Sequence, residues 1–97
     1  MESTGIQEGN EVLKINKIVC YPNPAATIIT VDRSSLIFNE KLPVTYTLVS
    51  LNGEKVMEFD KQDLQFSIPL DVVVNGVYSL TAKQGANRAT AVITVTK

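Results

Sequence analysis

The sequence predicts an all-β fold, an antiparallel sandwich or barrel of about seven strands. Three observations support this prediction. Short runs rich in β-branched and aromatic residues recur every ~8–14 residues, separated by Pro, Gly and Asn. Two of these runs alternate apolar and polar residues with a period of two, as in a sheet that is buried on one face. No stretch of useful length has a helical period, because β-branched residues occur throughout.

The first expected strand has two apolar phases. Leu13 and Ile15 alternate out of step with Ile18 and Cys20, and a β-bulge near Asn16–Lys17 would bring both sets onto one face. The later segments need no such correction. The expected strands are residues 12–20, 27–32, 44–51, 54–59, 64–68, 76–83 and 88–96.

The last two segments have the clearest alternation. Their apolar faces are formed by Tyr78, Leu80 and Ala82 and by Ala89, Ala91, Ile93 and Val95, and threonines occupy much of the opposite faces. Because alternate residues of a strand share one face, we expect these apolar sets to point into one core. The core is expected to contain Tyr46, Leu48, Tyr78, Leu80, Ile93 and Val95.

Asn52–Gly53 is the strongest local turn signal. A two-residue type I′ loop there gives better apolar cross-strand pairs, and it is therefore preferred. A three-residue loop with Gly53 in a bulge is the alternative, and it would pair Leu48 with Val56. The pairs expected from the preferred loop are Val49–Val56, Leu48–Met57 and Tyr46–Phe59.

Composition excludes several classes of function. Nine basic and ten acidic residues give a net charge of −1, and no basic run exists that could bind nucleic acid. With no histidine and a single cysteine, the chain lacks the usual ligands of a zinc site. Scattered acids do not suit calcium, and no apolar run approaches the ~18 residues of a membrane span. Cys20 has no partner for an internal disulfide and is expected to be a small buried hydrophobe.

No catalytic constellation is evident, so we expect no enzyme activity and no cofactor. The chain lacks histidine, the commonest general base, and no residue is placed to activate a serine. The nearest carboxylate pairs, Asp60 with Asp63 and Glu58 with Asp60, are interpreted as solvated turn residues. Among the aromatic residues only Tyr21 is free to serve as a sugar platform.

Residues 1–11 are expected to form a flexible linker, and residues 12–97 the folded domain. The segment MESTGIQEGNE has two glycines, three glutamates and one large aliphatic side chain, too little apolar surface to fold. It lacks the basic-then-apolar pattern of a signal peptide. Either the protein is cytosolic or the chain is a piece of something longer.

The segment YPNPA, Tyr21 to Ala25, predicts a rigid corner. Pro22 and Pro24 each fix φ near −65° and remove a hydrogen-bond donor, so the corner is expected not to add to a sheet ladder. Two readings are open: the corner sets the strand crossing between two sheets, or it presents a rigid surface to a partner. Gly76 is expected to adopt a conformation open chiefly to glycine, before Tyr78 packs inward.

The order of these motifs resembles the C-terminal sorting domain of type IX secretion substrates from Gram-negative bacteria. YPNPA, SLNGEKV and IPLDVVVNGVYSLTAKQG are followed by a terminal strand and a final lysine, and the resemblance covers about Ile18 to Lys97. The resemblance implies an immunoglobulin-like sandwich that is recognised as a secretion signal. The motif residues are Tyr21, Pro22, Asn23, Pro24, Asn52, Gly53, Gly76, Tyr78 and Lys97.

The resemblance also implies partners and a location. The domain would form the tail of a larger cargo protein, exported to the periplasm and then to the outer-membrane surface or the medium. Its partners would be the outer-membrane machinery and a sortase-like peptidase that cuts on its N-terminal side. Neither nucleic acid nor a small-molecule substrate is expected. The alternative is an immunoglobulin-like or fibronectin-like accessory domain that binds glycan or protein at the cell surface.

Overall fold

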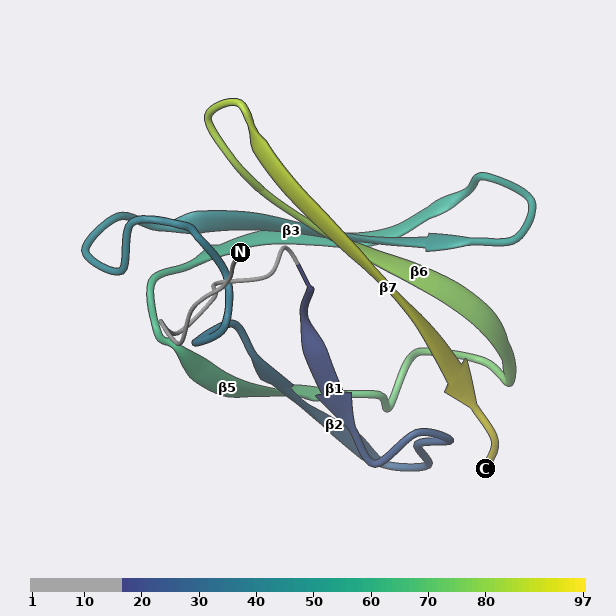
Figure 1. The fold of residues 1–97 in the computed structure, drawn as a ribbon. Helices are drawn as coiled ribbons and strands as arrows, with labels where there is room; N and C mark the ends of the chain where they lie inside the picture. The colour runs from purple at the N-terminus through teal and green to yellow at the C-terminus, as the bar shows by residue number, and fades with distance from the viewer. Residues whose placement is uncertain (1–16) are drawn as a thin grey trace, which may run out of the picture.

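The computed structural model describes residues 17–97, which form two sheets and no helix. The predicted linker and Asn16, the first residue of the bulge expected near Asn16–Lys17, lie outside the described residues. Figure 1 shows the sheets stacked as two layers. The strands are β1 (Val19–Tyr21), β2 (Ile28–Asp32), β3 (Val44–Ser50), β4 (Lys55–Lys61), β5 (Gln65–Pro69), β6 (Gly76–Gln84) and β7 (Asn87–Val95).

All neighbouring strands pair antiparallel, so the predicted fold class is confirmed. One sheet has the strand order β1-β2-β5 and the other β4-β3-β6-β7. The two sheets pack face to face as in an immunoglobulin-like sandwich. Among residues 17–97 no helix is long and apolar enough to cross a membrane.

The core lies between the two layers and contains all six residues that were predicted to form it. Tyr46, Leu48, Tyr78, Leu80, Ile93 and Val95 are all buried. At its centre, the Tyr46 ring stacks on Phe59 with centroids 5.6 Å apart and meets Phe66 edge-on at 4.9 Å. Such aromatic pairs add roughly 0.5–1.5 kcal/mol beyond the area that they bury.

The turn between β3 and β4 combines both loops that the sequence allows. At the tip, Ser50 N–H donates to the Glu54 carbonyl oxygen, and Gly53 has a φ of 84°. These two features are those of a three-residue loop, residues 51–53. A bulge then shifts the register, so that Leu48 pairs with Met57. The preferred two-residue loop is therefore wrong at the tip, where Val49 pairs with Lys55 instead of Val56. The predicted pairs Leu48–Met57 and Tyr46–Phe59 are confirmed.

Arg33 is the one charged side chain among residues 17–97 that is buried, and sequence reasoning did not identify it. Its guanidinium donates to five backbone carbonyl oxygens, of which the Gln62 oxygen is nearest at 2.6 Å. The acceptors belong to residues 39–42 and 62–63. A planar guanidinium with five donors suits such a set, and it ties the β2–β3 loop to the β4–β5 loop.

Two buried tyrosines differ in the fate of their hydroxyl groups. Tyr78 donates its hydroxyl hydrogen to the Val74 carbonyl oxygen. The Tyr46 hydroxyl is buried without a hydrogen-bond partner. Burial raises the pKa of Tyr46 to about 12, although the positive charge of Arg33 acts in the opposite direction. An unpartnered buried hydroxyl costs free energy.

Replacing each tyrosine by phenylalanine should separate these two situations. Tyr78→Phe should lower the free energy of unfolding by about 1 kcal/mol, because it removes a hydrogen bond. Tyr46→Phe should leave it within about 0.5 kcal/mol of the wild type or raise it, because no hydrogen bond is lost. Urea unfolding of both variants measures the difference, and an equal loss in the two would contradict the assigned partners.

Candidate functional site

The YPNPA motif forms the connection between β1 and β2 and lies on the surface. The Tyr21–Pro22 and Asn23–Pro24 peptide bonds are both cis. Pro22, Asn23 and Pro24 are exposed. Since neither proline has an N–H group, Asn23 and Ala25 are the only residues from Pro22 to Ala25 that can donate hydrogen bonds.

Both donors are used to attach the corner to β7, in the other sheet. Asn23 Nδ2 donates to the Val92 carbonyl oxygen, and Thr94 N–H donates to Asn23 Oδ1; each donor–acceptor distance is 3.0 Å. Ala25 N–H donates to the Thr94 carbonyl oxygen, and Thr96 N–H donates to the Ala25 carbonyl oxygen; each donor–acceptor distance is 2.8 Å. The Asn23 side-chain amide thus does what a backbone amide does in a sheet ladder.

The structure corrects one expectation for this motif. Ala25 forms an isolated parallel bridge with Val95, so the motif does add to a sheet, although its prolines do not. Both residues of this bridge are buried. The strands on either side of the corner, β1 and β2, belong to one sheet. The corner therefore does not carry the chain across to the other sheet; it fastens one sheet to the edge of the other.

The GVY motif begins β6, and its glycine has the expected unusual backbone. Gly76 has a φ of 159°, a value that side-chain-bearing residues rarely adopt. A Cβ atom at Gly76 would lie 3.6 Å from the Tyr78 ring, an ordinary contact. Tyr78 is buried as expected, and its hydroxyl holds the β5–β6 loop at Val74.

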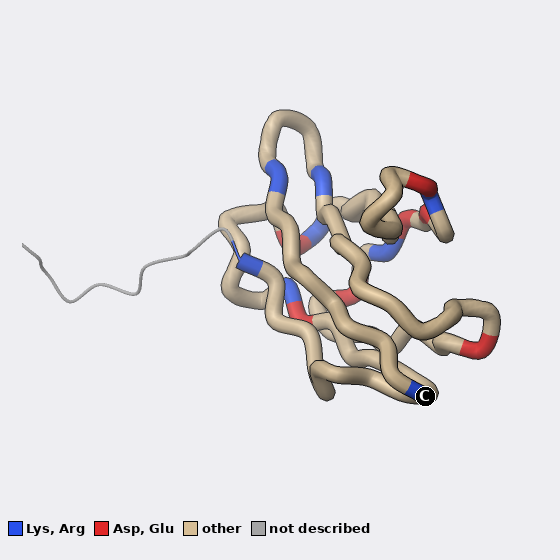
Figure 2. The backbone as a smooth tube through the Cα atoms, turned by 90° about the vertical axis from the view of Figure 1, so that its right-hand side faces the viewer, with Lys and Arg blue, Asp and Glu red and all other residues tan. Residues whose placement is uncertain are grey.

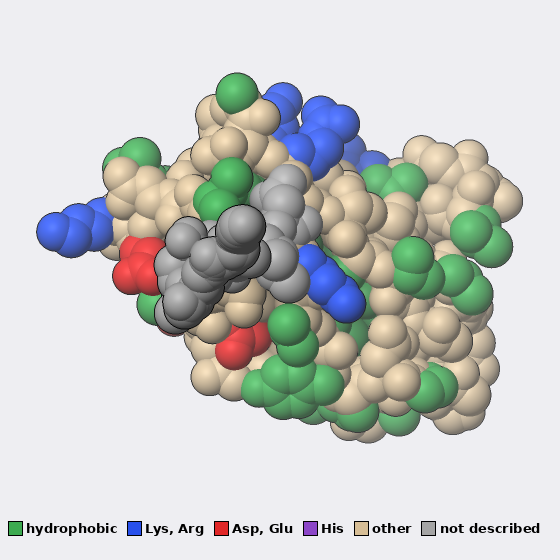
Figure 3. All heavy atoms as spheres, in the orientation of Figure 1, with side chains coloured by type: hydrophobic (Ala, Val, Ile, Leu, Met, Phe, Trp, Pro, Cys, Tyr) green, Lys and Arg blue, Asp and Glu red, His purple; other side chains and the backbone are tan. Residues whose placement is uncertain are grey.

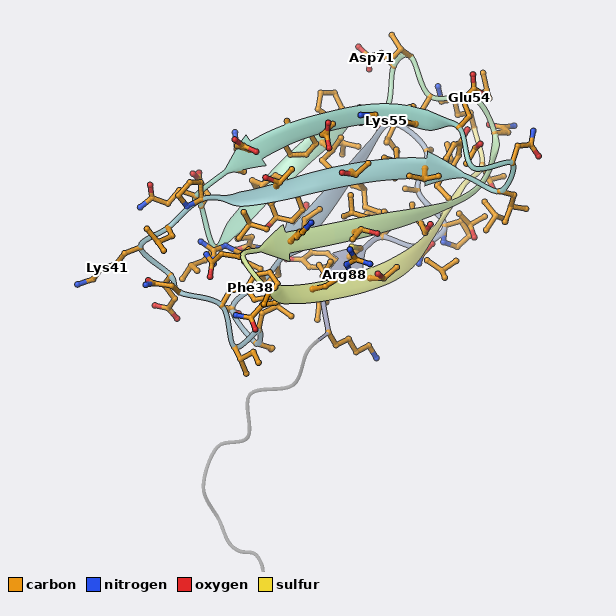
Figure 4. The ribbon with its side chains drawn as sticks, turned by 90° about the horizontal axis from the view of Figure 1, so that it is seen from above. Phe38, Lys41, Glu54, Lys55, Asp71 and Arg88 are labelled. Carbon is orange, nitrogen blue, oxygen red and sulfur yellow. The ribbon has the colours of Figure 1, made fainter. Side chains whose placement is uncertain are left out.

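The β3–β4 and β5–β6 loops enclose a hollow of about 520 Å³. Asn52, Gly76 and Tyr78 all line it. Large aliphatic side chains surround it at the surface: Leu51 is 79% exposed, Val72 81% and Val74 73%. We call Leu51, Val72 and Val74 the aliphatic end surface. In Figure 3 hydrophobic side chains reach the surface at this end of the molecule, and Figure 4 places Glu54, Lys55 and Asp71 there, opposite Phe38 and Lys41.

Lys97 is held against the same β5–β6 loop. Its backbone N–H donates to Asn75 Oδ1 at a distance of 2.9 Å, and its Nζ donates to the Asp71 carbonyl oxygen at a distance of 3.3 Å. Figure 2 looks onto this end and shows Lys97 beside the connecting loops. Lys97 thus fastens the chain after β7 to the loop that carries Val72 and Val74.

The predicted motif residues fall into two groups. Asn52, Gly76 and Tyr78 line the first hollow, whereas Asn23 is bonded to β7, and the Tyr21 side chain is turned away from both. Tyr21 accepts a hydrogen bond from Gln65 Nε2, which places its ring on the outer face of the three-stranded sheet. Sequence reasoning missed Leu51, Val72 and Val74. Their only sequence signal was that large aliphatic residues stand beside turn residues, where polar residues are usual.

The acidic side chains serve as surface hydrogen-bond acceptors. Lys55 and then Thr47 lower the pKa of Glu58 by donating to its carboxylate. Ser34 lowers the pKa of Asp32 in the same way. Within the described part of the chain, no three His, Cys, Asp or Glu residues lie close enough together to hold a metal ion.

The aliphatic end surface is suited to binding another macromolecule through apolar contacts.

Asn23 can be tested by two substitutions. Asn23→Ala should lower the free energy of unfolding by roughly 1–2 kcal/mol, because two hydrogen bonds to β7 are lost. Asn23→Asp should keep the acceptor for the Thr94 amide and lose only the donor to Val92. Amide exchange at Thr94 should therefore be much faster in Asn23→Ala than in Asn23→Asp. Equal exchange in both variants would contradict this role of the side chain.

Cys20 is half-buried and poorly reactive by its environment. Burial raises the pKa of its thiol from 9.0 to about 11. Because the pKa of the thiol rises by about two, the fraction of thiolate at pH 8 falls roughly 100-fold, and the thiolate is the reactive form. Alkylation by iodoacetamide at pH 8 should therefore be at least about tenfold slower in the folded protein than in urea. Equal rates would show that the thiol is not desolvated.

A solved structure supports the fold. An immunoglobulin-like β-sandwich protein of the DUF3244 family from Bacteroides vulgatus superposes with a TM-score of 0.62 and 16% identity, over 79% of this chain and 81% of the other. At this identity the likeness concerns the fold alone. No curated protein matches the sequence significantly.

The family comparison adds what the fold cannot. The model of the secretion system C-terminal sorting domain matches residues 19–96, which span all seven strands and every motif residue except Lys97. The chain therefore belongs to this family, and it is a C-terminal sorting domain of the kind that directs type IX secretion cargo.

Proposed function

We propose that the machinery of type IX secretion recognises this domain at the end formed by the β3–β4 and β5–β6 loops. Sorting domains form the C-terminal tail of cargo proteins that the type IX system exports to the cell surface or the medium. The family and the sandwich fold indicate a non-catalytic module. Recognition of the folded end is the step that such a module can supply.

The observation that carries this proposal is the aliphatic end surface. Leu51, Val72 and Val74 are each more than 70% exposed and surround one hollow. Single exposed aliphatic residues are ordinary, whereas a cluster of them is typical of an interaction site. Burying three such side chains contributes about 25 cal/mol per Å², several kcal/mol in all.

The finer steps are also proposals. The cargo passes through the periplasm, and the outer-membrane machinery then contacts the aliphatic end surface. A sortase-like peptidase cuts on the N-terminal side of the domain, within residues 1–11. An accessory domain that binds glycan or protein is the alternative, and no feature of residues 17–97 favours it over sorting.

A reporter fusion tests the proposed surface. The 97-residue chain is fused behind a periplasmic reporter and expressed in a host with the type IX machinery. The wild-type fusion should reach the surface or the medium, and deletion of the machinery should retain it. Replacing Leu51, Val72 and Val74 by Gln, Thr and Thr should reduce export more than tenfold, because each factor of ten needs only about 1.4 kcal/mol of lost binding.

The opposite end of the sandwich supplies a matched control. Ile37 is 52% exposed and Leu42 is 50% exposed, both in the β2–β3 loop. Ile37→Thr with Leu42→Gln should leave export unchanged. Surface changes of this kind alter stability by about 0.5 kcal/mol or less, so all variants should fold. Equal loss in both sets would point to a general effect of surface polarity, and retention of the wild type would overturn the sorting function itself.

A further inference from the structure

Four strands lie at sheet edges, and three of them are shielded against further pairing. Unpaired edges invite another strand, and proteins block them with charges, proline or short strands. β4 carries Lys55, Glu58, Asp60 and Lys61. β5 ends at Pro69, and β1 is only three residues long and is followed by Pro22.

Among the described residues, the YPNPA corner covers the fourth edge, β7, only from Val92 onward. Residues of an antiparallel strand alternately direct their backbone groups toward one neighbour and away from it. The bonds from Asn23 and Ala25 show that Val92, Thr94 and Thr96 direct theirs away from β6. By the same alternation, Thr90 directs its N–H and C=O outward. No residue of the described chain pairs with these two groups or with Val92 N–H.

The stretch of β7 from Thr90 to Val92 borders a second hollow. This hollow, of about 400 Å³, lies between β1 and β7 and is lined by Lys17, Cys20, Asn23, Thr90 and Val92, among others. Thr90 is exposed, and Val92 is 62% exposed. The free backbone groups of β7 therefore face an open space beside the sheet, where an additional strand has room to bind.

The described charges nearest this hollow are positive. Among residues 17–97, Lys17 is the one charged residue that lines it. Arg88 precedes Thr90 on the same face of β7 and lies opposite Lys83 of β6, and Figure 2 shows both basic positions flanking the tip of the β6–β7 hairpin. The acidic residues Glu58 and Asp60 belong to β4, at the far edge of the sheet. A partner with acidic side chains is favoured electrostatically.

We propose that an extended, acidic segment of a partner protein adds to β7 at Thr90–Val92 and continues the four-stranded sheet. Backbone hydrogen bonds to Thr90 and Val92 would supply the pairing, and the basic rim would select an acidic segment. This contact lies on the flank of the sandwich beside Lys17, whereas the aliphatic end surface lies on the β3–β4 and β5–β6 loops. The two surfaces can therefore be tested separately.

The substitution Thr90→Pro tests the free edge directly. Proline removes the N–H that points outward and leaves the bonds between β6 and β7 intact, as is tolerated at a sheet edge. Thr90→Val is the matched control, because it keeps the N–H and the β-branched side chain. The probe is a synthetic peptide, Glu-Val-Thr-Val-Thr-Val-Glu, and a second peptide with Lys at both ends reports the effect of charge.

Nuclear magnetic resonance titration of the 97-residue chain measures binding. The acidic peptide should shift the Thr90 and Val92 amide signals and slow their exchange with solvent. Thr90→Pro should weaken binding about tenfold or more, and Thr90→Val less than about twofold, since tenfold corresponds to roughly one hydrogen bond. The Lys-ended peptide should bind more weakly at low salt, with a smaller difference at high salt.

Several results would overturn the proposal. These are no binding at about millimolar peptide, signal shifts centred on β4 or β5, or equal binding by Thr90→Pro and the wild type. If Thr90→Pro does not fold, slowed exchange at Thr90 and Val92 in the wild type decides the question alone. The titration does not depend on secretion, so it stands whether or not the reporter fusion is exported.

Discussion

The hydrogen bonds between the YPNPA corner and β7 hold the two sheets together at one end of the sandwich. Apolar packing fixes how far apart the sheets lie, but it is not directional and does not fix their edges. Asn23 and Ala25 add direction, because they bind consecutive backbone groups of β7. The position of β7 in turn places Lys97 against the β5–β6 loop. The placement of the β5–β6 loop and its part of the aliphatic end surface therefore depends on a contact between the first and the last strands of the domain.

Much of the fold could be predicted because strand alternation is a local property. The inward positions of β3, β6 and β7 follow from period two, and their buried residues agree with it. The tip of the β3–β4 turn was not predictable, because two loop lengths were compatible with Asn52–Gly53 and a bulge absorbs the difference. Alternation also says nothing about loops, so the buried Leu36, Phe38 and Val73 were missed.

The candidate site was predicted in its parts and not in its arrangement. Proline geometry identified a rigid corner, and Gly76 identified a constrained start to β6. The role of Asn23 depends on β7, because its partners Val92 and Thr94 lie 69 and 71 positions later in the sequence. Arg33 is similar, since five carbonyl groups from two loops converge on it. Such contacts exist only once the sandwich has formed, and no local pattern encodes them.

The parallel course of the corner and β7 has a consequence for the contacts that the domain can make. The chain enters the described domain at Lys17, beside the Thr90 half of β7, whereas Lys97 and the aliphatic end surface lie past the other half. At about 3.3 Å per residue, the stretch from Thr90 to Thr96 separates them by roughly 20 Å. Lys17 and the aliphatic end surface are therefore far enough apart for a partner to contact one without covering the other. A single small sandwich thus offers two separate sides for contact.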